Sequence, residues 1–217
     1  MDKEKVLKAL KEIKAASKKR NFKQTVDLII NLKGLDLKKP EHQVEFFATL
    51  SHNVGKKKKI CALVGPELAD EAKKTCDTTI LQDDFDKYAK DKKLAKKLAT
   101  AHDFFIAQAN IMPKIATAFG RVLGPKGKMP NPKAGCVVPP KAALKPLYDK
   151  LQLTQKISAK TQQIVHCPVG KEDLNDEAVA ENIIDIVNQL EGKLIQGKDN
   201  VHSIYIKLTM GQPVKLQ

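Results

Sequence analysis

The first part of the chain shows a helical and then a strand-like pattern of apolar positions. Through residues 3–17 apolar side chains recur at helical spacing with lysines opposite them, which predicts an amphipathic helix. The next segment alternates, and one side carries Phe22, Gln24, Val26, Leu28, Ile30 and Leu32. Such alternation is typical of a strand with one buried face. A turn over 34–40 and a second strand over about 44–50 complete this part.

The middle of the chain alternates short apolar runs with helical patterns. Strands are expected over 60–64, 79–81 and 104–107, and helices over about 67–74, 85–99 and 112–122. Strands that alternate with helices indicate right-handed crossovers and a parallel sheet with helices on both faces. We therefore expect residues 61–155 to form a self-contained α/β domain.

The last part of the chain again shows strand-like and helical patterns of the kind seen in the first part. The expected elements are a hairpin of strands 157–161 and 164–167, a helix over 176–190 with Asn175 as N-cap and Gly192 at its end, and a strand over 201–209. Residues 1–60 and residues 156–217 each hold too few elements to bury a sheet face. Together they provide two helices to cover one side of a four- or five-stranded sheet. We therefore expect one domain built from both ends of the chain, with 61–155 inserted and the other sheet face open to a partner.

Composition narrows the class of protein. The 217 residues include 42% apolar and 29% charged side chains, which excludes a wholly disordered, collagen-like or membrane-embedded chain and allows one or two domains. The first residues do not form a signal peptide, and no apolar run approaches 18 residues. We expect a cytoplasmic protein with no membrane partner.

The net charge of +14 predicts a polyanionic partner, most commonly nucleic acid. The excess lies in residues 1–60 and 61–155, and it consists of lysine apart from Arg20 and Arg121. Lysine suits phosphate, whereas the guanidinium fork is the usual reader of guanine edges. With few arginines and aromatics, the protein is expected to recognise backbone, shape and hydroxyl groups, as in folded RNA.

The sequence contains no recognisable catalytic or metal site. The four cysteines (Cys61, Cys76, Cys136 and Cys167) lack CxxC spacing, and the histidines do not complete a zinc ligand set. Buried free thiols in a reducing compartment are the expected state. No nucleophile elbow is present, so neither an enzyme nor a cofactor is expected.

The densest glycine–proline stretch spans residues 120–135. It is not a phosphate-binding P-loop, because Val122 stands where the first glycine is required and Met129 replaces the Ser or Thr. Its basic side chains are Arg121, Lys126, Lys128 and Lys133. They favour a loop that faces an anion over a merely rigid surface loop.

This stretch, GRVLGPKGKMPNPKAG, closely resembles the signature of the large-subunit ribosomal protein one family. Further matches follow the family's order: RNF at 20–22 with Thr25 after it, HCPVG at 166–170 and LTMG at 208–211. They span nearly the whole chain. The segment AHDFFIAQANIMP resembles the archaeal branch of the family.

The resemblance implies a two-layer α/β domain made of both termini and an inserted three-layer, Rossmann-like α/β domain. It also implies that the terminal domain binds the stalk region of large-subunit rRNA near the tRNA exit site, and a similar structure in the protein's own mRNA, which represses translation. The inserted domain would flank exit-site tRNA as it leaves. Off the ribosome we expect a monomer.

The resemblance further implies an RNA-binding patch. Its residues are Phe22, Thr25, Thr209, Met210 and Gly211, with Ser203 near the same strand and Arg20 and Asn21 as further candidates. They form one patch only if the first and last strands lie side by side. Gln24 departs from the family, because many relatives carry an acid there.

Two other functions stay open at this point. The middle domain could bind a nucleotide in an enzyme, which a thermal-shift screen with nucleotides would reveal. The chain could also be a free-standing regulator of messengers, which cosedimentation with large subunits would test.

Overall fold

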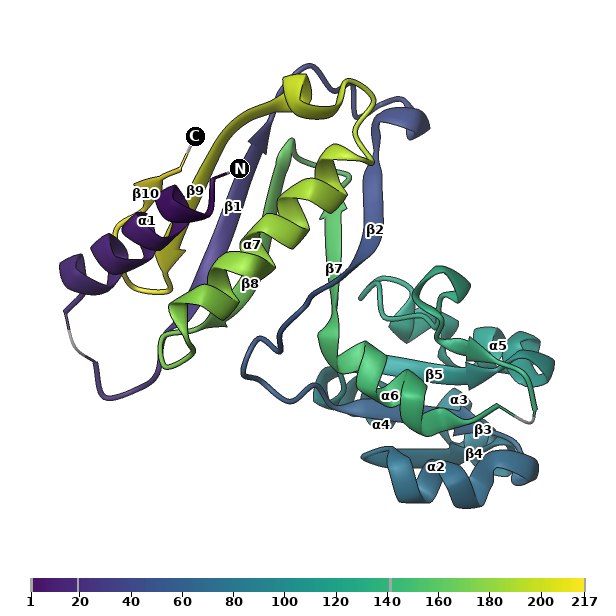
Figure 1. Cartoon of the computed structure of the whole chain (residues 1–217). Helices are drawn as coiled ribbons and strands as arrows, with labels where there is room; N and C mark the ends of the chain where they lie inside the picture. Colours follow the sequence, from purple (N-terminus) through teal and green to yellow (C-terminus); the bar gives the residue numbers. More distant parts are fainter. Residues whose placement is uncertain (1, 19, 141, 217) are drawn as a thin grey trace. The chain divides into compact units, whose positions relative to one another are not determined.

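The computed structural model describes residues 2–18, 20–140 and 142–216, and the chain divides into two compact units (Figure 1). The first unit contains residues 1–56 and 153–217, and the second contains residues 57–152. Each unit has a sheet and a core of its own. The units are described separately below.

The first unit is built on a four-stranded antiparallel sheet with the order β10-β9-β1-β8. The strands are β1 (Thr25–Leu32), β8 (Ile164–Lys171), β9 (Val201–Leu208) and β10 (Val214–Lys215). The side of β1 that the alternation predicts to be buried, Val26 to Leu32 at every second residue, is buried. The first and last long strands of the chain are therefore direct neighbours in the sheet.

Two helices, α1 (Lys3–Ala16) and α7 (Asp176–Glu191), cover one face of this sheet (Figure 1). The Asn175 side chain caps α7 by accepting a hydrogen bond from the Glu177 amide at 3.1 Å, and the helix ends at Gly192, as expected. The helix packs closely on β8, because a Cβ added to Gly170 would lie 2.7 Å from Val179 Cγ2. No helix of the described part of this unit covers the opposite face, whose β1 residues are half-buried.

The expected hairpin of 157–161 with 164–167 is wrong. Strand β7 (Thr154–Ala159) pairs instead with β2 (Val44–Thr49) in a separate two-stranded sheet, whereas β8 pairs with β1. The connection over 160–163 has no glycine or asparagine, so it lacks the turn residues that a tight hairpin requires. Alternation alone identifies a strand but not its partner.

The second unit contains a four-stranded parallel sheet with the order β4-β3-β5-β6. Its strands are β3 (Ile60–Val64), β4 (Thr78–Leu81), β5 (Phe104–Gln108) and β6 (Val137–Val138). Every residue of β3 is buried, as expected for a central strand covered on both faces. Its helices are α2 (Ala69–Thr75), α3 (Phe85–Lys90), α4 (Lys92–Ala101), α5 (Met112–Leu123) and α6 (Leu144–Leu153). The expected fold class, a terminal α/β domain with an inserted Rossmann-like α/β domain, is confirmed.

Some elements differ from the sequence prediction. The lysine-rich helix expected over 85–99 is divided into α3 and α4 at Asp91, whose carboxylate accepts hydrogen bonds from the Lys93 and Leu94 amides. Helix α6 and the two-residue strands β6 and β10 were not predicted. Short 3-10 turns lie at Pro40–His42, Pro66–Leu68, Gln82–Asp84, Ala109–Ile111, Pro132–Ala134 and Gly197–Asn200. No helix among the described residues has the length and apolar character to cross a membrane.

Candidate nucleic-acid interface

The antiparallel pairing of β1 with β9 brings the start of the first strand to the end of the last one. The Thr209 amide donates to the Thr25 carbonyl at 3.0 Å. The Thr209 hydroxyl also donates to that carbonyl and accepts from the Thr25 amide, both at 3.2 Å. The condition for a single patch, two neighbouring strands, is therefore met for these two threonines.

A tight turn follows β9 and presents Met210. The Gly211 amide donates to the Leu208 carbonyl at 2.9 Å, and a Cβ added to Gly211 would lie 3.2 Å from Leu208 Cβ, so the turn favours glycine. The Met210 amide donates to the side-chain oxygen of Gln24 at 3.1 Å. Its side chain is 60% exposed. The turn thus holds a large apolar side chain in solvent.

Phe22 provides a second exposed apolar side chain in the segment that leads into β1. The strand begins at Thr25, and the alternating burial extends back only to Gln24, which is 1% exposed. Phe22 is 55% exposed and does not belong to the buried side of the strand. Exposed large apolar side chains near basic residues are typical of interaction surfaces rather than of a core.

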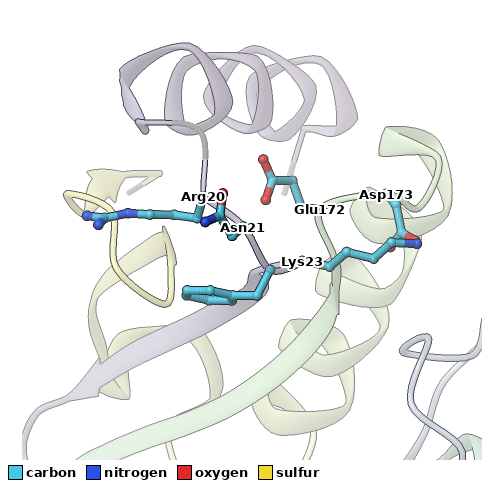
Figure 2. A pocket seen from close by; sticks show the side chains of 6 residues that line it. Arg20, Asn21, Lys23, Glu172 and Asp173 are labelled. Atoms are coloured by element: carbon cyan, nitrogen blue, oxygen red, sulfur yellow. The ribbon is translucent and has the colours of Figure 1, made fainter.

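A depression of about 300 Å³ lies beside this segment, and Figure 2 shows the side chains that line it. It is lined by Arg20, Asn21, Phe22, Lys23, Glu172 and Asp173. The Lys23 ammonium pairs with the Asp173 carboxylate, whereas the Arg20 side chain extends away from both acidic residues (Figure 2). The Glu172 carboxylate accepts a hydrogen bond from the backbone amide of Gln24 at 3.3 Å. Both carboxylates therefore have partners, whereas Arg20 is exposed and lies away from them.

We call the group Arg20, Asn21, Phe22, Lys23, Thr25, Glu172, Asp173, Thr209, Met210 and Gly211 the strand-end surface. Lys23, Glu172 and Asp173 were missed in the sequence. The antiparallel pairing of Thr25 with Lys171 places the residues after β8 here. The sequence prediction pairs the strand of 164–167 with residues 157–161, so it does not place Lys171 beside Thr25.

Ser203 lies apart from the strand-end surface. It pairs with Asn31 at the far end of β1, six positions from Thr209, which is about 20 Å along an extended strand. It is 1% exposed, and its hydroxyl accepts a hydrogen bond from Asn31 Nδ2 at 2.9 Å. The structure does not bring this candidate together with the others.

The open sheet face carries a cluster of titratable side chains between the strand-end surface and Ser203. Asp27 lies on β1, opposite Lys207 of β9, with His166 Nε2 of β8 at 3.9 Å from its carboxylate. Partial burial raises the pKa of Asp27, although the charges of His166 and Lys207 act in the opposite direction. The carboxylate is therefore less well solvated here than in water.

The four basic residues of the 120–135 loop have different surroundings. Arg121 and Lys133 are exposed. The exposed Lys126 ammonium donates to Thr100 Oγ1 at 2.6 Å. Lys128 donates to the carbonyls of Ala99 and His102, at 3.0 and 2.6 Å, at the carboxyl end of α4. A cation at that position stabilises the helix, so Lys128 fixes the loop to the protein.

In the second unit a buried side chain occupies the position where comparable parallel sheets bind a nucleotide. In such sheets a ligand binds at the carboxyl ends of the strands where the strand order reverses, here between β3 and β5. The buried Gln108 side chain occupies this position and accepts from the Gly65 amide at 2.8 Å. Its Nε2 donates to Glu67 at 3.3 Å. The protein's own side chain therefore fills the place where a phosphate would approach the backbone.

All four cysteines are free. Cys61, Cys136 and Cys167 are buried, and burial raises their pKa values to about 12, 11 and 12, whereas Cys76 is half-buried. Inert thiols are the consequence for the three buried residues. Within 2–18, 20–140 and 142–216 no group of three or more His, Cys, Asp or Glu side chains can hold a metal ion.

Comparison with known proteins gives matches along the whole chain. The sequence profile of the "Ribosomal protein L1p/L10e family" matches residues 10–212. A protein of Methanothermococcus thermolithotrophicus named "Large ribosomal subunit protein uL1" is 44% identical over 217 residues, which are 100% of both chains. Proteins of the same name from Thermococcus kodakarensis and Nanoarchaeum equitans are 43% and 42% identical, over 100% and 92% of this chain and 98% and 93% of their own length.

Proposed function

The chain belongs to the ribosomal protein L1p/L10e family, and from this membership we propose that it is a structural component of the large ribosomal subunit that binds ribosomal RNA through the strand-end surface. The similar archaeal proteins carry the name of a large-subunit protein. The family is one of ribosomal proteins and not of enzymes, so the alternative of a nucleotide-binding enzyme is wrong. The crevice filled by Gln108 agrees with this result.

The observation that carries the RNA-binding part is the joining of Thr25 with Thr209. Their hydrogen bonds join the segment that carries the exposed Phe22 to the turn that carries the exposed Met210, where the two central strands of the sheet end. Phe22 and Met210 would pack on riboses and exclude water, and Arg20 would approach a phosphate. Such contacts read the shape of a folded RNA rather than its base edges.

Thr209 has a smaller direct role in this proposal than the sequence suggested. Its hydroxyl hydrogen is directed to the Thr25 carbonyl. The oxygen retains one acceptor position, which a ribose 2′-hydroxyl can use as donor. We therefore assign Thr209 first to holding the two strands together and second to contact with RNA.

In finer detail, we propose that the protein binds where members of its family bind, at the stalk region of large-subunit RNA beside the tRNA exit site. The first unit would bind that RNA and a similar structure in the protein's own mRNA, repressing translation. The second unit would flank deacylated tRNA as it leaves. Arg121, Lys126 and Lys133 supply exposed charge on the second unit, whereas Lys128 anchors their loop.

The test of the surface is a pair of matched variants. Met210 and Ile195 are both 60% exposed in the first unit, but Ile195 precedes the start of β9 whereas Met210 follows its end. Met210→Asp should weaken binding of the full chain to a large-subunit rRNA fragment by about 1–3 kcal/mol, because a carboxylate is added at the RNA contact. Ile195→Asp should leave binding nearly unchanged. Equal losses in the two variants would refute the proposed surface.

The finer assignments need separate measurements. Cosedimentation with large subunits at moderate salt should recover the chain, and a chain that remains in the supernatant would favour the free-standing regulator. Binding of the leader of the protein's own mRNA should compete with the rRNA fragment, because both would use the same surface. Simultaneous binding of the two RNAs would contradict the proposed repression mechanism.

A further inference from the structure

Helix α4 of the second unit has a face made almost entirely of lysine. At helical spacing Lys93, Lys96, Lys97 and Thr100 share one side, and Ala95 and Ala99 are buried on the other. The lysine side chains and Ala101 border a depression of about 490 Å³. The Lys126 ammonium reaches the same face through its hydrogen bond to Thr100.

The positive charges of α4 are placed where they destabilise the helix. Lys92 and Lys93 stand in the first turn, where the helix dipole disfavours cations, and no acidic residue lies in that turn. Lys92 with Lys96, and Lys93 with Lys97, are like-charged pairs four residues apart, which repel. By contrast, α2 ends with Lys73 and Lys74, where the dipole favours them. An anion bound on the α4 face would relieve this repulsion.

The lysines of this face have not been neutralised by the protein. Across residues 2–18, 20–140 and 142–216, no ion pair includes Lys93, Lys96, Lys97 or Lys126. The N-cap carboxylate of Asp91 is the acidic group nearest in the sequence, and it is engaged by two backbone amides. The face therefore retains its positive charge.

We propose that the α4 lysine face, Lys93, Lys96, Lys97 and Lys126, is a second RNA-binding surface, which takes the phosphodiester backbone of a folded RNA. The Cβ atoms of lysines three or four residues apart on a helix are about 5–6 Å from one another. A row of cations at this spacing suits an anion whose charges repeat along a chain better than a single small ion. Lysine side chains contact phosphates without reading bases. This inference rests on the proposed place of the second unit beside transfer RNA and gives that contact its own surface, which does not depend on the strand-end surface.

In this proposal the loop of residues 120–135 contributes positive charge to the α4 lysine face. Lys128 fixes the loop to the last carbonyls of α4, and Lys126, two residues earlier, adds its charge to the lysine face. The glycine–proline stretch thus extends the helix face rather than forming a separate anion site.

The test compares two double variants of the full-length chain. Lys96→Ala/Lys97→Ala removes two charges from α4, and the control Lys73→Ala/Lys74→Ala removes two exposed charges from α2 of the same unit. Alanine favours helices, so both variants should fold. With unfractionated transfer RNA as probe, the α4 variant should raise Kd about fivefold and lower the slope of log Kd against log salt by about two, and the control should change Kd less than about twofold.

A local measurement separates this surface from the first one. Acetylation of lysines in the full chain, followed by mass spectrometry, should show protection of Lys93, Lys96 and Lys97 by transfer RNA, both in the unaltered chain and in the Met210→Asp variant. Protection that disappears with Met210→Asp, equal effects of the two double variants, or protection by phosphatidylglycerol vesicles but not by RNA would each overturn the proposal.

Discussion

The side-chain oxygen of Gln24 accepts a hydrogen bond from the Met210 amide at 3.1 Å, so a residue before the first long strand holds the turn after the last one. Gln24 is 1% exposed, and its Nε2 donates to Ser17 Oγ at 3.0 Å. One amide group thus connects the segment after α1, the approach to β1 and the turn after β9. The position of the exposed Met210 side chain depends on it.

Replacement of the Gln24 side-chain amide by an apolar group of similar size should disturb the turn after β9. In Gln24→Leu the Met210 amide loses its partner, and we expect the free energy of unfolding to fall by about 1–3 kcal/mol. Urea unfolding gives this quantity, and hydrogen exchange of the Met210 amide reports the local effect. Unchanged protection of that amide would contradict the role assigned to Gln24.

The Thr209 hydroxyl should contribute to stability as well as to RNA binding. Thr209→Val removes both of its hydrogen bonds with the Thr25 backbone, so we expect a loss of about 1 kcal/mol. Thr209→Ser keeps the hydroxyl and serves as the control. Thermal unfolding of the two variants should separate them. A valine variant with full stability and weakened RNA binding would show that the hydroxyl acts on RNA alone.

The close packing of α7 on β8 predicts a steric effect at Gly170. An added Cβ would lie 2.7 Å from Val179 Cγ2, so Gly170→Ala should destabilise the protein by about 1–3 kcal/mol. Val179→Ala removes the obstructing methyl groups. The double variant should therefore be less destabilised than the sum of the two single variants, which a double-mutant cycle measures. If the two changes in the free energy of unfolding simply add, the destabilisation by Gly170→Ala does not come from contact with Val179.

The partial burial of Asp27 predicts a pH-dependent effect of its substitution. Because folding raises the pKa of this carboxyl above the ordinary aspartate value, its ionisation opposes folding. The opposition is complete above the raised pKa and absent below the ordinary one. Asp27→Asn should thus be more stable than the unaltered chain at pH 7, and the gain should vanish as the pH falls through that window. Urea unfolding at pH 7, 5 and 3 checks this sign, and a gain that grows towards low pH would refute it.

Much of the architecture follows from local patterns in the sequence. The alternation from Val26 to Leu32 predicts β1 and its buried side, because the two faces of a strand differ in solvent contact. Asn175 and Gly192 predict the ends of α7, because capping is local chemistry. The shortage of elements in each terminal part predicts the shared sheet, since neither part could bury a sheet face alone.

The remaining features depend on partners distant in sequence. β7 pairs with β2 rather than with β8, and alternation does not encode a strand's partner. Helix α6 was not predicted, and its Pro146 stands in the first turn, where it interrupts no hydrogen bond of the helix. At the strand-end surface, the exposed Phe22 and the buried Gln24 could not be separated by alternation, which places them on the same side. The division between α3 and α4 depends on a single carboxylate, that of Asp91.

The pairing of β1 with β9 also has a consequence for biosynthesis. Thr25 is synthesised first, and Thr209 is added 184 residues later. Because β9 cannot join β1 earlier, a nascent chain has no complete strand-end surface, whereas the second unit, continuous in sequence, can already fold. Nascent copies that have not yet been extended through β9 would therefore not compete for the RNA that we propose for this surface.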